Sequence, residues 1–353
     1  MYDAPAIYVR FLDKHILSES GRLIFSILNV FVVSGYRVIL SDTISIDPDT
    51  RIGQLTLSLG RLEVSDAIPG NSQDFVYLFD REDKQCAGKK WKRKIQLGYD
   101  IFSSYWLTKK PILMPYPMHP VHWGHHGKDM YGVLRCLRKS QKRLRLFFSG
   151  DTNGYNRPKV KYPDVKLSRP EIIEILLQRL PDDSLILDDE TTLSAAFAGD
   201  YLNKFVVLDT TRLWVDDALW LDRLSRADFF LSPPGICMPM CHNVIEAMAL
   251  GVIPVINYPE WFSPGLEHMK NCIAFGDADD LARKVRHVLG MGERQIAELR
   301  NNVISYYQEH LRPETFVRRI EQAPGGTVQV LMVTEKYVNK NSSKLGKRSI
   351  LMR

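Results

Sequence analysis

The chain has 353 residues, of which 45% are hydrophobic, 25% charged and 10% aromatic. This length predicts about two globular domains, and the composition excludes a collagen, a coiled-coil rod, a disordered chain and a disulfide-stabilised miniprotein. The net charge of +6 comes from one stretch: residues 336–353 carry six basic and no acidic side chains, leaving 41 of the 47 Lys and Arg residues to balance the 41 Asp and Glu residues.

The first third of the chain alternates predicted strands and helices. Residues 6–12 suit a buried strand, residues 22–34 an apolar helix and residues 37–41 a second strand. A strand, a helix and a strand within about 35 residues predict a parallel pair with a right-handed crossover. Residues 74–79 predict another strand, and residues 109–127, rich in Pro, His and aromatic side chains, predict a loop.

A second alternation starts with a strand at residues 144–149, followed by a helix at 170–180. Further strands are predicted at 184–187, 205–208, 228–231 and 252–256, and further helices at 215–226, 242–250, 278–289, 293–307 and 313–320. Two separate starts predict two doubly wound, Rossmann-like α/β domains that face a cleft. The expected limits are 1–140 for the first domain, 141–320 for the second, and 321–353 for a basic, weakly ordered tail.

Cysteine content and charge placement bear on location. Five cysteines at irregular spacing predict reduced thiols and a cytoplasmic protein. No apolar stretch reaches the roughly 20 residues of a bilayer span, and charged residues interrupt the first apolar run, which argues against a signal peptide. The basic tail and two acid-free clusters, residues 84–94 and 135–145, are either solvated charge or a surface for the anionic inner face of a membrane. Nucleic acid is not an expected partner, because the rest of the chain has no basic excess.

The most informative segment is residues 225–256, in which a buried strand ends at Leu231 and a helix begins near His242. Ligands bind at this position in open α/β sheets, and the free N–H groups of a helix N-terminus favour a phosphate. Glu246, one turn into the helix, either accepts hydrogen bonds from a ribose or sugar diol or is an ordinary exposed helix residue.

Two pieces of this segment carry a family resemblance: Ser-Pro-Pro-Gly at 232–235, and Asn-Val-Ile-Glu-Ala-Met-Ala-Leu-Gly-Val-Ile-Pro-Val-Ile at 243–256. Together they resemble the donor-binding segment of GT-B glycosyltransferases, with the exostosin-like group nearest in character. Residues 146–150, Leu-Phe-Phe-Ser-Gly, resemble the strand and turn that open the second domain of that group. The resemblance covers about residues 142–275.

The resemblance implies transfer of a sugar from a nucleotide-activated donor, bound by the second domain, to an acceptor held by the first. It implies that Glu246 holds the donor ribose or sugar and that Arg157 neutralises the leaving phosphate. The full set of implied donor-binding residues is Gly150, Arg157, Pro234, Gly235, Met240, His242, Asn243 and Glu246.

Such enzymes generally need no metal, and no cofactor is expected. The chain lacks an Asp-x-Asp between strand residues, although Asp188-Asp189-Glu190 leaves a metal site open. The loop 237–241 and His242 depart from the family pattern, so UDP-, GDP- and CMP-linked donors all remain open. The basic stretches favour a glycan or lipid-linked acceptor in surface polysaccharide biosynthesis.

The catalytic base has several candidates. The run His119-Pro-Val-His-Trp-Gly-His-His126 holds four of the nine histidines, and an imidazole pKa near 6.5 suits proton removal from an acceptor hydroxyl. His122 and His125 are the candidates in this run, and Asp13, beyond the first strand, is the alternative. The run could also be a metal site or ordinary packing.

Other interpretations stay open. Cys237, Cys241 and His242 could be three zinc ligands, although buried or loop cysteines are the simpler interpretation. Trp214 and Trp220 are most simply core residues. The chain could also be a nucleotide-sugar epimerase of the same superfamily, or a non-catalytic scaffold with this fold.

Overall fold

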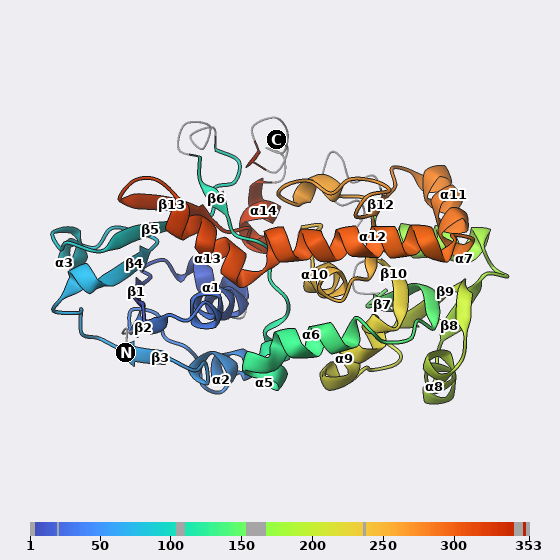
Figure 1. Ribbon diagram of the computed structural model, residues 1–353, viewed down its shortest axis with the longest axis horizontal. Helices are drawn as coiled ribbons and strands as arrows, with labels where there is room; N and C mark the ends of the chain where they lie inside the picture. The colour runs from blue at the N-terminus through green and yellow to red at the C-terminus, as the bar shows by residue number, and fades with distance from the viewer. Residues whose placement is uncertain are drawn as a thin grey trace.

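The computed structural model describes residues 4–19, 21–103, 110–152, 167–235, 238–341 and 349–350. It contains two parallel sheets, of seven and six strands, which lie next to each other along the long axis of the molecule (Figure 1). Helices connect the strands in both. The prediction of two doubly wound, Rossmann-like α/β domains is therefore confirmed.

The first sheet has the strand order β3-β2-β1-β4-β5-β13-β6, with every pair parallel. Its strands are β1 (Ala6–Arg10), β2 (Arg37–Ser41), β3 (Leu62–Ser65), β4 (Phe75–Phe79), β5 (Arg93–Gly98), β6 (Ile112–Leu113) and β13 (Thr327–Leu331). All five residues of β1 are buried, as expected for a central strand covered on both faces. On one face α1 (Arg22–Val33) packs between α2 (Arg51–Leu57) and α13 (Pro313–Gln322).

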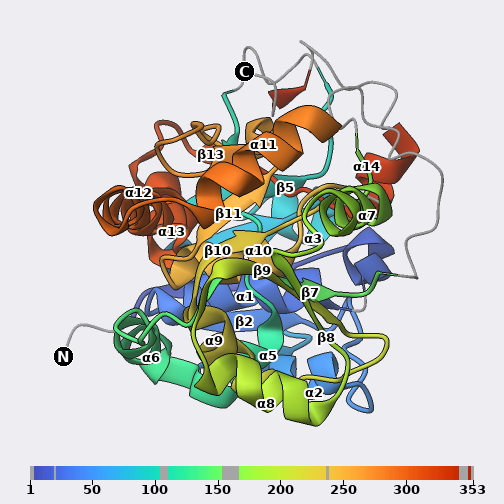
Figure 2. The ribbon, with the colours of Figure 1, turned by 90° about the vertical axis from the view of Figure 1, so that its right-hand side faces the viewer.

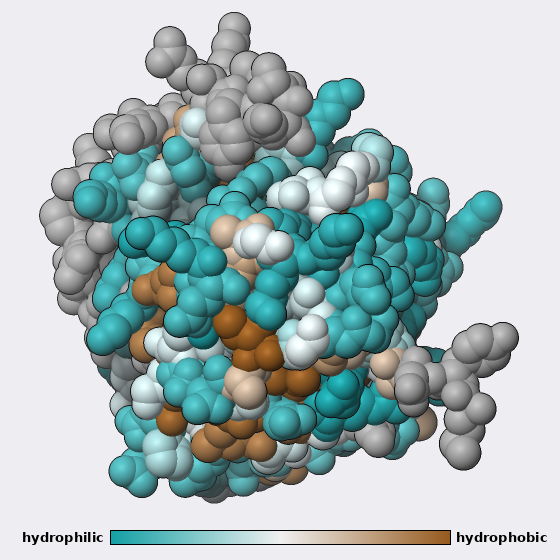
Figure 3. All heavy atoms as spheres, turned by 90° about the vertical axis from the view of Figure 1, so that its left-hand side faces the viewer, coloured by the Kyte–Doolittle hydropathy of each residue, from teal (hydrophilic) through white to brown (hydrophobic). Residues whose placement is uncertain are grey.

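The other face of this sheet has a thinner cover. Tyr8 and Tyr77 lie beneath Trp91, with ring centroids 5.7 and 4.6 Å from the indole. Helix α3 (Lys84–Ala87), a single turn, packs on this face through Cys86. Figure 3 views the end of the molecule that lies at the left in Figure 1, where α3 is, and shows a hydrophobic area surrounded by hydrophilic surface.

The C-terminal part of the chain differs from the prediction. Residues 321–353 were expected to form a weakly ordered tail, but β13 is inserted between β5 and β6 of the first sheet. Val328, Val330 and Leu331 of that strand are buried, and the burial of their apolar side chains stabilises the strand. The prediction of a weakly ordered tail relied instead on the basic residues that follow. The chain thus returns to the first domain after completing the second. Helix α14 (Glu335–Asn341) follows β13, while residues 342–348 and 351–353 of the expected tail lie outside the described residues.

The second sheet has the strand order β12-β11-β10-β7-β9-β8. Its strands are β7 (Leu144–Gly150), β8 (Ser184–Leu187), β9 (Tyr201–Asp209), β10 (Ala227–Leu231), β11 (Ile253–Ile256) and β12 (Ile273–Ala274). Its helices are α7 (Arg169–Arg179), α8 (Glu190–Ala198), α9 (Asp217–Ser225), α10 (His242–Ala249), α11 (Ala278–Leu289) and α12 (Glu293–Tyr306). In the end-on view of this domain, α8 and α9 lie below the sheet and α11 and α12 above it (Figure 2).

The order of strands in the second sheet marks a ligand position. The chain runs from β7 to β8 and β9 on one side, then crosses to β10 and β11 on the other. Connections leave β7 and β10 in opposite directions, so a crevice opens beyond the carboxyl ends of these two strands.

Residues 120–137 link the two domains. They form α5 (Pro120–His126) and α6 (Met130–Leu137), so the predicted loop at 109–127 contains a helix. Pro120 suits the first helical position, and the His119 ring accepts a hydrogen bond from the Val121 N–H at 3.3 Å, which caps the start. Gly124 allows α5 to pack closely on α2, because a Cβ there would lie 2.3 Å from Leu55. Helix α5 contacts α1 and α2 of the first domain and α9 of the second.

The basic cluster at 135–145 is only partly exposed, with Arg135 and Lys139 on the surface. Arg145 is buried and pairs with Asp228 at 2.9 Å. Arg138 and Lys142 donate to main-chain carbonyls of the second domain. These three side chains contribute to the fold, and a membrane contact through the rest of the cluster stays a prediction.

Candidate functional site

A cavity of about 190 Å³ lies beyond the carboxyl edge of the second sheet, at the crevice between β7 and β10. We call it the switch-point cavity. Ser149 and Gly150 end β7 at its base, and His242 and Asn243 begin α10 at its side. The other lining residues are His119, Val121, His122, Thr210, Trp214, Val215, Asp217, Trp220 and Glu246. Helix α5 therefore closes the cavity from the side of the first domain.

Glu246 is the centre of a hydrogen-bond network at this cavity. Its Oε1 accepts the His119 N–H at 3.0 Å and lies 3.2 Å from His122 Nε2, and its Oε2 accepts Trp220 Nε1–H at 2.6 Å. The side chain is fully buried. One carboxylate thus joins α5, α9 and α10.

This geometry differs from the expectation for Glu246. Both interpretations of Glu246, as a sugar-binding carboxylate and as an exposed helix residue, require a carboxylate that is accessible. In the structure, three donors from the protein itself occupy its two oxygens. Helix α5 supplies two of these donors from residues more than 120 positions earlier in the chain, which local sequence does not reveal.

The charge state of this network follows from its geometry. Burial by itself would raise the pKa of Glu246, but His122, His242 and the hydrogen bonds outweigh burial and hold its pKa well below the ordinary value. An ionised carboxylate needs a donor opposite it, so the contact places a proton on His122 Nε2. His122 Nδ1, the other ring nitrogen, is buried without a hydrogen-bond partner among the described residues. In a neutral ring this arrangement would leave Nδ1 free to act as a general base.

Burial disfavours the charged form of the two neighbouring histidines, His119 and His242. Burial, followed by the proximity of His242, lowers the pKa of His119 to about 4. Burial also lowers the pKa of His242. The two rings lie 4.9 Å apart at the start of α5 and of α10. Together with His122 they line the cavity, so His119, His122 and His242 belong to one site.

The other two base candidates lie elsewhere. His125 is exposed on α5, where its ring contacts that of His126, and it does not line the cavity. Asp13 follows β1, and its Oδ2 lies 2.7 Å from Arg81 Nη2. Burial would raise the pKa of Asp13, but hydrogen bonds from the His15 N–H and Arg81 lower it. Of the three candidates, the structure brings only His122 into the cavity.

The predicted donor-binding residues divide into two groups. Gly150, His242, Asn243 and Glu246 line the switch-point cavity. Pro234, Gly235 and Met240 instead form a packed loop: Pro234 and Met240 are buried, and a Cβ at Gly235 would lie 2.6 Å from the Met238 carbonyl oxygen. That loop fixes the start of α10. Arg157 and Cys237 lie outside the described residues.

The start of α10 is open to an anion. Cys241 precedes it in an extended conformation and makes no side-chain capping hydrogen bond. The first N–H groups of a helix lack partners within the helix, and its dipole favours negative charge there. None of the described lining residues is Lys or Arg, so the helix N-terminus is the main electropositive feature of the described wall.

Sequence reasoning missed Trp214, which was assigned to the core. Its side chain is 71% exposed and lines the cavity. An exposed indole at a polar cavity suits stacking on a sugar or a base. Its position in the sequence could have indicated this role, because Trp214 lies five residues after β9 ends at Asp209, on the ligand-binding edge of the sheet. Trp220, also assigned to the core, is half-buried and donates to Glu246.

Two further searches concern metals and membranes. Within the described ranges, no group of three or more His, Cys, Asp or Glu side chains is placed to hold a metal ion. Asp189 is the N-cap of α8, where it accepts the Thr192 N–H at 2.7 Å. In the same ranges no helix has the length and apolar character needed to cross a bilayer.

Comparisons with known proteins leave the family open. No protein-family model and no curated protein matches the chain. Among solved structures, a glycosyltransferase from Rickettsia africae is 9% identical with a TM-score of 0.45, over 91% of this chain and 98% of that one. Anabaena HepE, solved with UDP and glucose, is 11% identical with a TM-score of 0.42, over 90% and 98%. WaaG, a glycosyltransferase of lipopolysaccharide biosynthesis, is 11% identical with a TM-score of 0.37, over 90% and 100%. At TM-scores below 0.5 these likenesses carry no argument, and function has to be inferred from the site.

Proposed function

We propose that the chain is a glycosyltransferase in which the switch-point cavity binds a nucleotide-activated sugar and His122 is the catalytic base. The observation that carries this proposal is the His122–Glu246 pair in a cavity at the start of α10. The resemblance of residues 232–256 to a donor-binding segment supports the same assignment.

In this proposal the donor lies along the carboxyl edge of the second sheet. Its phosphate group, a diphosphate in a UDP- or GDP-linked sugar and a monophosphate in a CMP-linked one, meets the N-terminus of α10 and Asn243. Trp214 stacks on the sugar or the base. Arg51 reaches the rim from the first domain, where it pairs with Asp217 at 2.6 Å. A UDP-, GDP- or CMP-linked sugar fits this arrangement equally well.

The proposed chemistry is a single displacement. The acceptor hydroxyl oxygen forms a bond to the anomeric carbon while the bond from that carbon to the phosphate oxygen breaks, and the electron pair leaves with the phosphate. His122 Nδ1 takes the hydroxyl proton, and the resulting imidazolium is stabilised by the Glu246 carboxylate. The N-terminus of α10 stabilises the leaving phosphate. A single displacement inverts the anomeric configuration.

A neighbouring small cavity is the proposed approach for the acceptor. It lies between the start of α1 and residues 116–120, and it shares His119 and His242 with the switch-point cavity. Glu19 and Arg22 of the first domain line it. We propose a glycan or lipid-linked sugar as acceptor, in surface polysaccharide biosynthesis.

A membrane contact is proposed for the first domain. Lys84, Lys90 and Lys92 are exposed around α3, at the end of the molecule seen in Figure 3. Basic side chains near an anionic lipid surface contribute about 1 kcal/mol each. Charge reversal of these three lysines should abolish co-sedimentation with anionic vesicles while leaving the melting temperature unchanged. Full retention of vesicle binding would remove this part of the proposal.

The proposal is tested by turnover with a matched pair of histidine variants. His122→Ala should lower kcat by about 100- to 10,000-fold, the usual contribution of a general base. His125→Ala, on the exposed side of the same helix, should leave kcat unchanged. NMR of the product should show an inverted anomeric centre. Equal losses in the two variants, or conversion of the nucleotide-sugar with no acceptor present, would contradict the proposal.

A further inference from the structure

The largest of the cavities described here lies away from the switch-point cavity, on the side of α5 that faces the first domain. Its volume is about 440 Å³, more than twice that of the switch-point cavity, and no residue lines both. We call it the α1–α5 cavity. Its apolar wall comes from Phe25, Val33, Leu55, Leu59, Trp123 and Tyr131. A concave site of this size with apolar and aromatic walls is typical of a small-molecule pocket.

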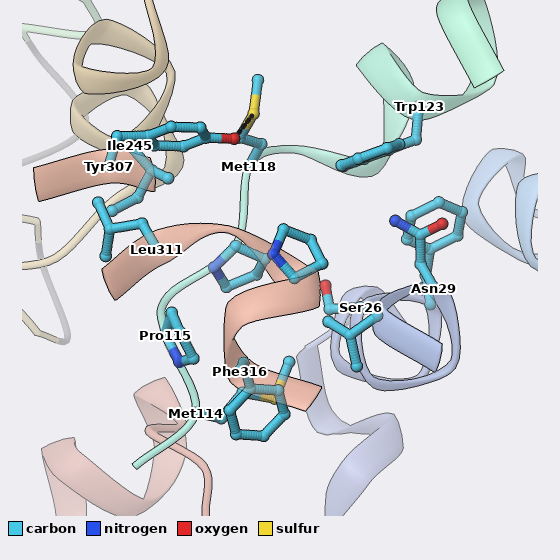
Figure 4. Close-up of a pocket in the computed structure, with 14 residues that line it drawn as sticks. Ser26, Asn29, Met114, Pro115, Met118, Trp123, Ile245, Tyr307, Leu311 and Phe316 are labelled. Carbon is cyan, nitrogen blue, oxygen red and sulfur yellow. Dashed lines mark hydrogen bonds between the residues drawn. The ribbon is translucent and has the colours of Figure 1, made fainter. Parts of the chain in front are cut away.

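A buried amide sits in this wall. Asn29, on α1, is only 5% exposed, and it lines the α1–α5 cavity. It also lines a smaller adjoining cavity of about 30 Å³, and Phe25 and Trp123 likewise line both. Figure 4 shows Asn29 on α1 beside Trp123 of α5. The amide therefore presents a donor and an acceptor to a molecule in the cavity.

The rim of the α1–α5 cavity carries a cation in an unusual conformation. Arg61 is exposed and has a φ of 68°, in the left-handed region that non-glycine residues rarely adopt. Its Nη1 donates to the Gly35 carbonyl, which leaves other guanidinium donors for a ligand. The acid in the lining, Glu314, is already engaged by Tyr131 Oη–H at 2.7 Å and by Arg312 at 3.1 Å.

We propose that the α1–α5 cavity binds a small aromatic acid: a planar ring with a hydrogen-bonding edge and one acidic substituent. The ring packs against Phe25 and Trp123, its edge pairs with the donor and acceptor of the Asn29 amide, and the acidic group meets Arg61. An acyl chain fits less well, because it would leave the Asn29 amide unpaired. A nucleoside monophosphate and an aryl carboxylate share the required chemistry.

The test uses the full-length chain and the fluorescent probe 8-anilinonaphthalene-1-sulfonate, which has aromatic rings and one sulfonate. Gly60 lines the cavity, and no atom lies within 4 Å of where its Cβ would be, so a Trp side chain can be introduced at the cavity wall without a clash at its Cβ. Gly70 is equally open but does not line the cavity, which makes Gly70→Trp the matched control. We expect Gly60→Trp to weaken probe binding at least tenfold and Gly70→Trp to leave it unchanged.

A second variant separates binding from folding. Asn29→Leu approximately keeps the volume of the side chain and removes the amide, so we expect a melting temperature that is not lowered together with at least tenfold weaker probe binding. Competition with AMP and with indole-3-acetate then distinguishes a nucleotide from an aryl carboxylate. Unchanged probe binding in both Gly60→Trp and Asn29→Leu would overturn the proposal. His122→Ala should leave probe binding intact, so failure of the glycosyltransferase proposal and failure of this one are distinguishable.

Discussion

The two sheets have the same kind of switch point and use it differently. In the first sheet, between β1 and β4, the Asp80 carboxylate accepts the N–H groups of Leu12 and Asp13 at 2.9 and 2.6 Å. In the second, the Glu246 carboxylate binds an imidazole, an indole and the N–H of His119, the residue before α5, and the start of α10 has no side-chain cap. The first switch point is therefore closed by its own carboxylate, and the second has donors left for a ligand. The strand order therefore locates a possible ligand site in each sheet. The position of one carboxylate, Asp80 or Glu246, determines whether main-chain donors at that site are left for a ligand.

The largest expected effect comes from the two carboxylates themselves. Glu246→Gln keeps the shape of the side chain but replaces one carboxylate oxygen by an NH2 group, which cannot accept the hydrogen bonds that this oxygen accepts. The free energy of unfolding should therefore fall by about 1–3 kcal/mol. The activity of this variant should fall at least about 100-fold, because the His122 tautomer is no longer fixed. Asp80→Asn is the matched change at the first switch point.

Asp80→Asn should cost comparable stability and leave kcat within about twofold, since it does not line the switch-point cavity. Calorimetry and steady-state kinetics on both variants provide the comparison. If Asp80→Asn proved as inactive as Glu246→Gln, the two switch points would not differ in function.

A smaller effect is expected at Trp214. Because its side chain is 71% exposed, Trp214→Ala should not change the melting temperature. Loss of a stacking surface should weaken donor binding by about 1–3 kcal/mol, the range for stacking of a base on an aromatic side chain. The readout is KM for the donor against kcat, and a loss confined to kcat would exclude a stacking role.

The contributions of His119 and Glu19 to stability are expected to change with pH in opposite directions. The pKa of His119 is lowered to about 4, so the unfolded state binds the extra proton and stability should fall as the pH drops from about 6.5 to 4. The pKa of Glu19 is raised to about 7 by burial and then by Glu335, so its contribution is lost as the pH rises from about 4.3 to 7.

Melting curves of His119→Asn and Glu19→Gln against pH separate the two contributions. His119→Asn keeps a capping acceptor at the start of α5 and should be less sensitive to acid than the unmodified chain. The melting temperature of Glu19→Gln should fall less than that of the unmodified chain as the pH rises from about 4.3 to 7. Parallel curves for all three proteins would show that neither group is coupled to folding.

The smallest effect is expected at the ion pair between the domains. Arg51 and Asp217 lie 2.6 Å apart, but their side chains are 57% and 31% exposed. Exposed pairs contribute about 0–1 kcal/mol, so Arg51→Ala should shift the melting temperature little at physiological salt. A loss of several kcal/mol would mean that this pair holds the two domains together.

Local pattern was sufficient for most of the fold and for half of the site. The alternation of apolar runs, the Pro-Pro-Gly turn and the start of α10 all depend on neighbouring residues, and the structure has them near the expected positions. The burial of Glu246 depends on α5, which reaches it from a distant part of the chain. The use of Arg145 inside the second domain depends on Asp228, 83 residues away. Composition is a poor guide to such positions, since a basic run in the sequence does not show which charges will find buried partners.

Nucleotide binding by the switch-point cavity is the central claim, and thermal denaturation with UDP, GDP and CMP tests it most directly. A nucleotide at 100 times its Kd should add about 2.7 kcal/mol of stability. Asn243→Asp, which places a negative charge at the start of α10, should remove the shift, while Asp13→Asn at the first switch point should keep it. No shift with any nucleotide, or a shift that survives Asn243→Asp and disappears in Asp13→Asn, would contradict the account.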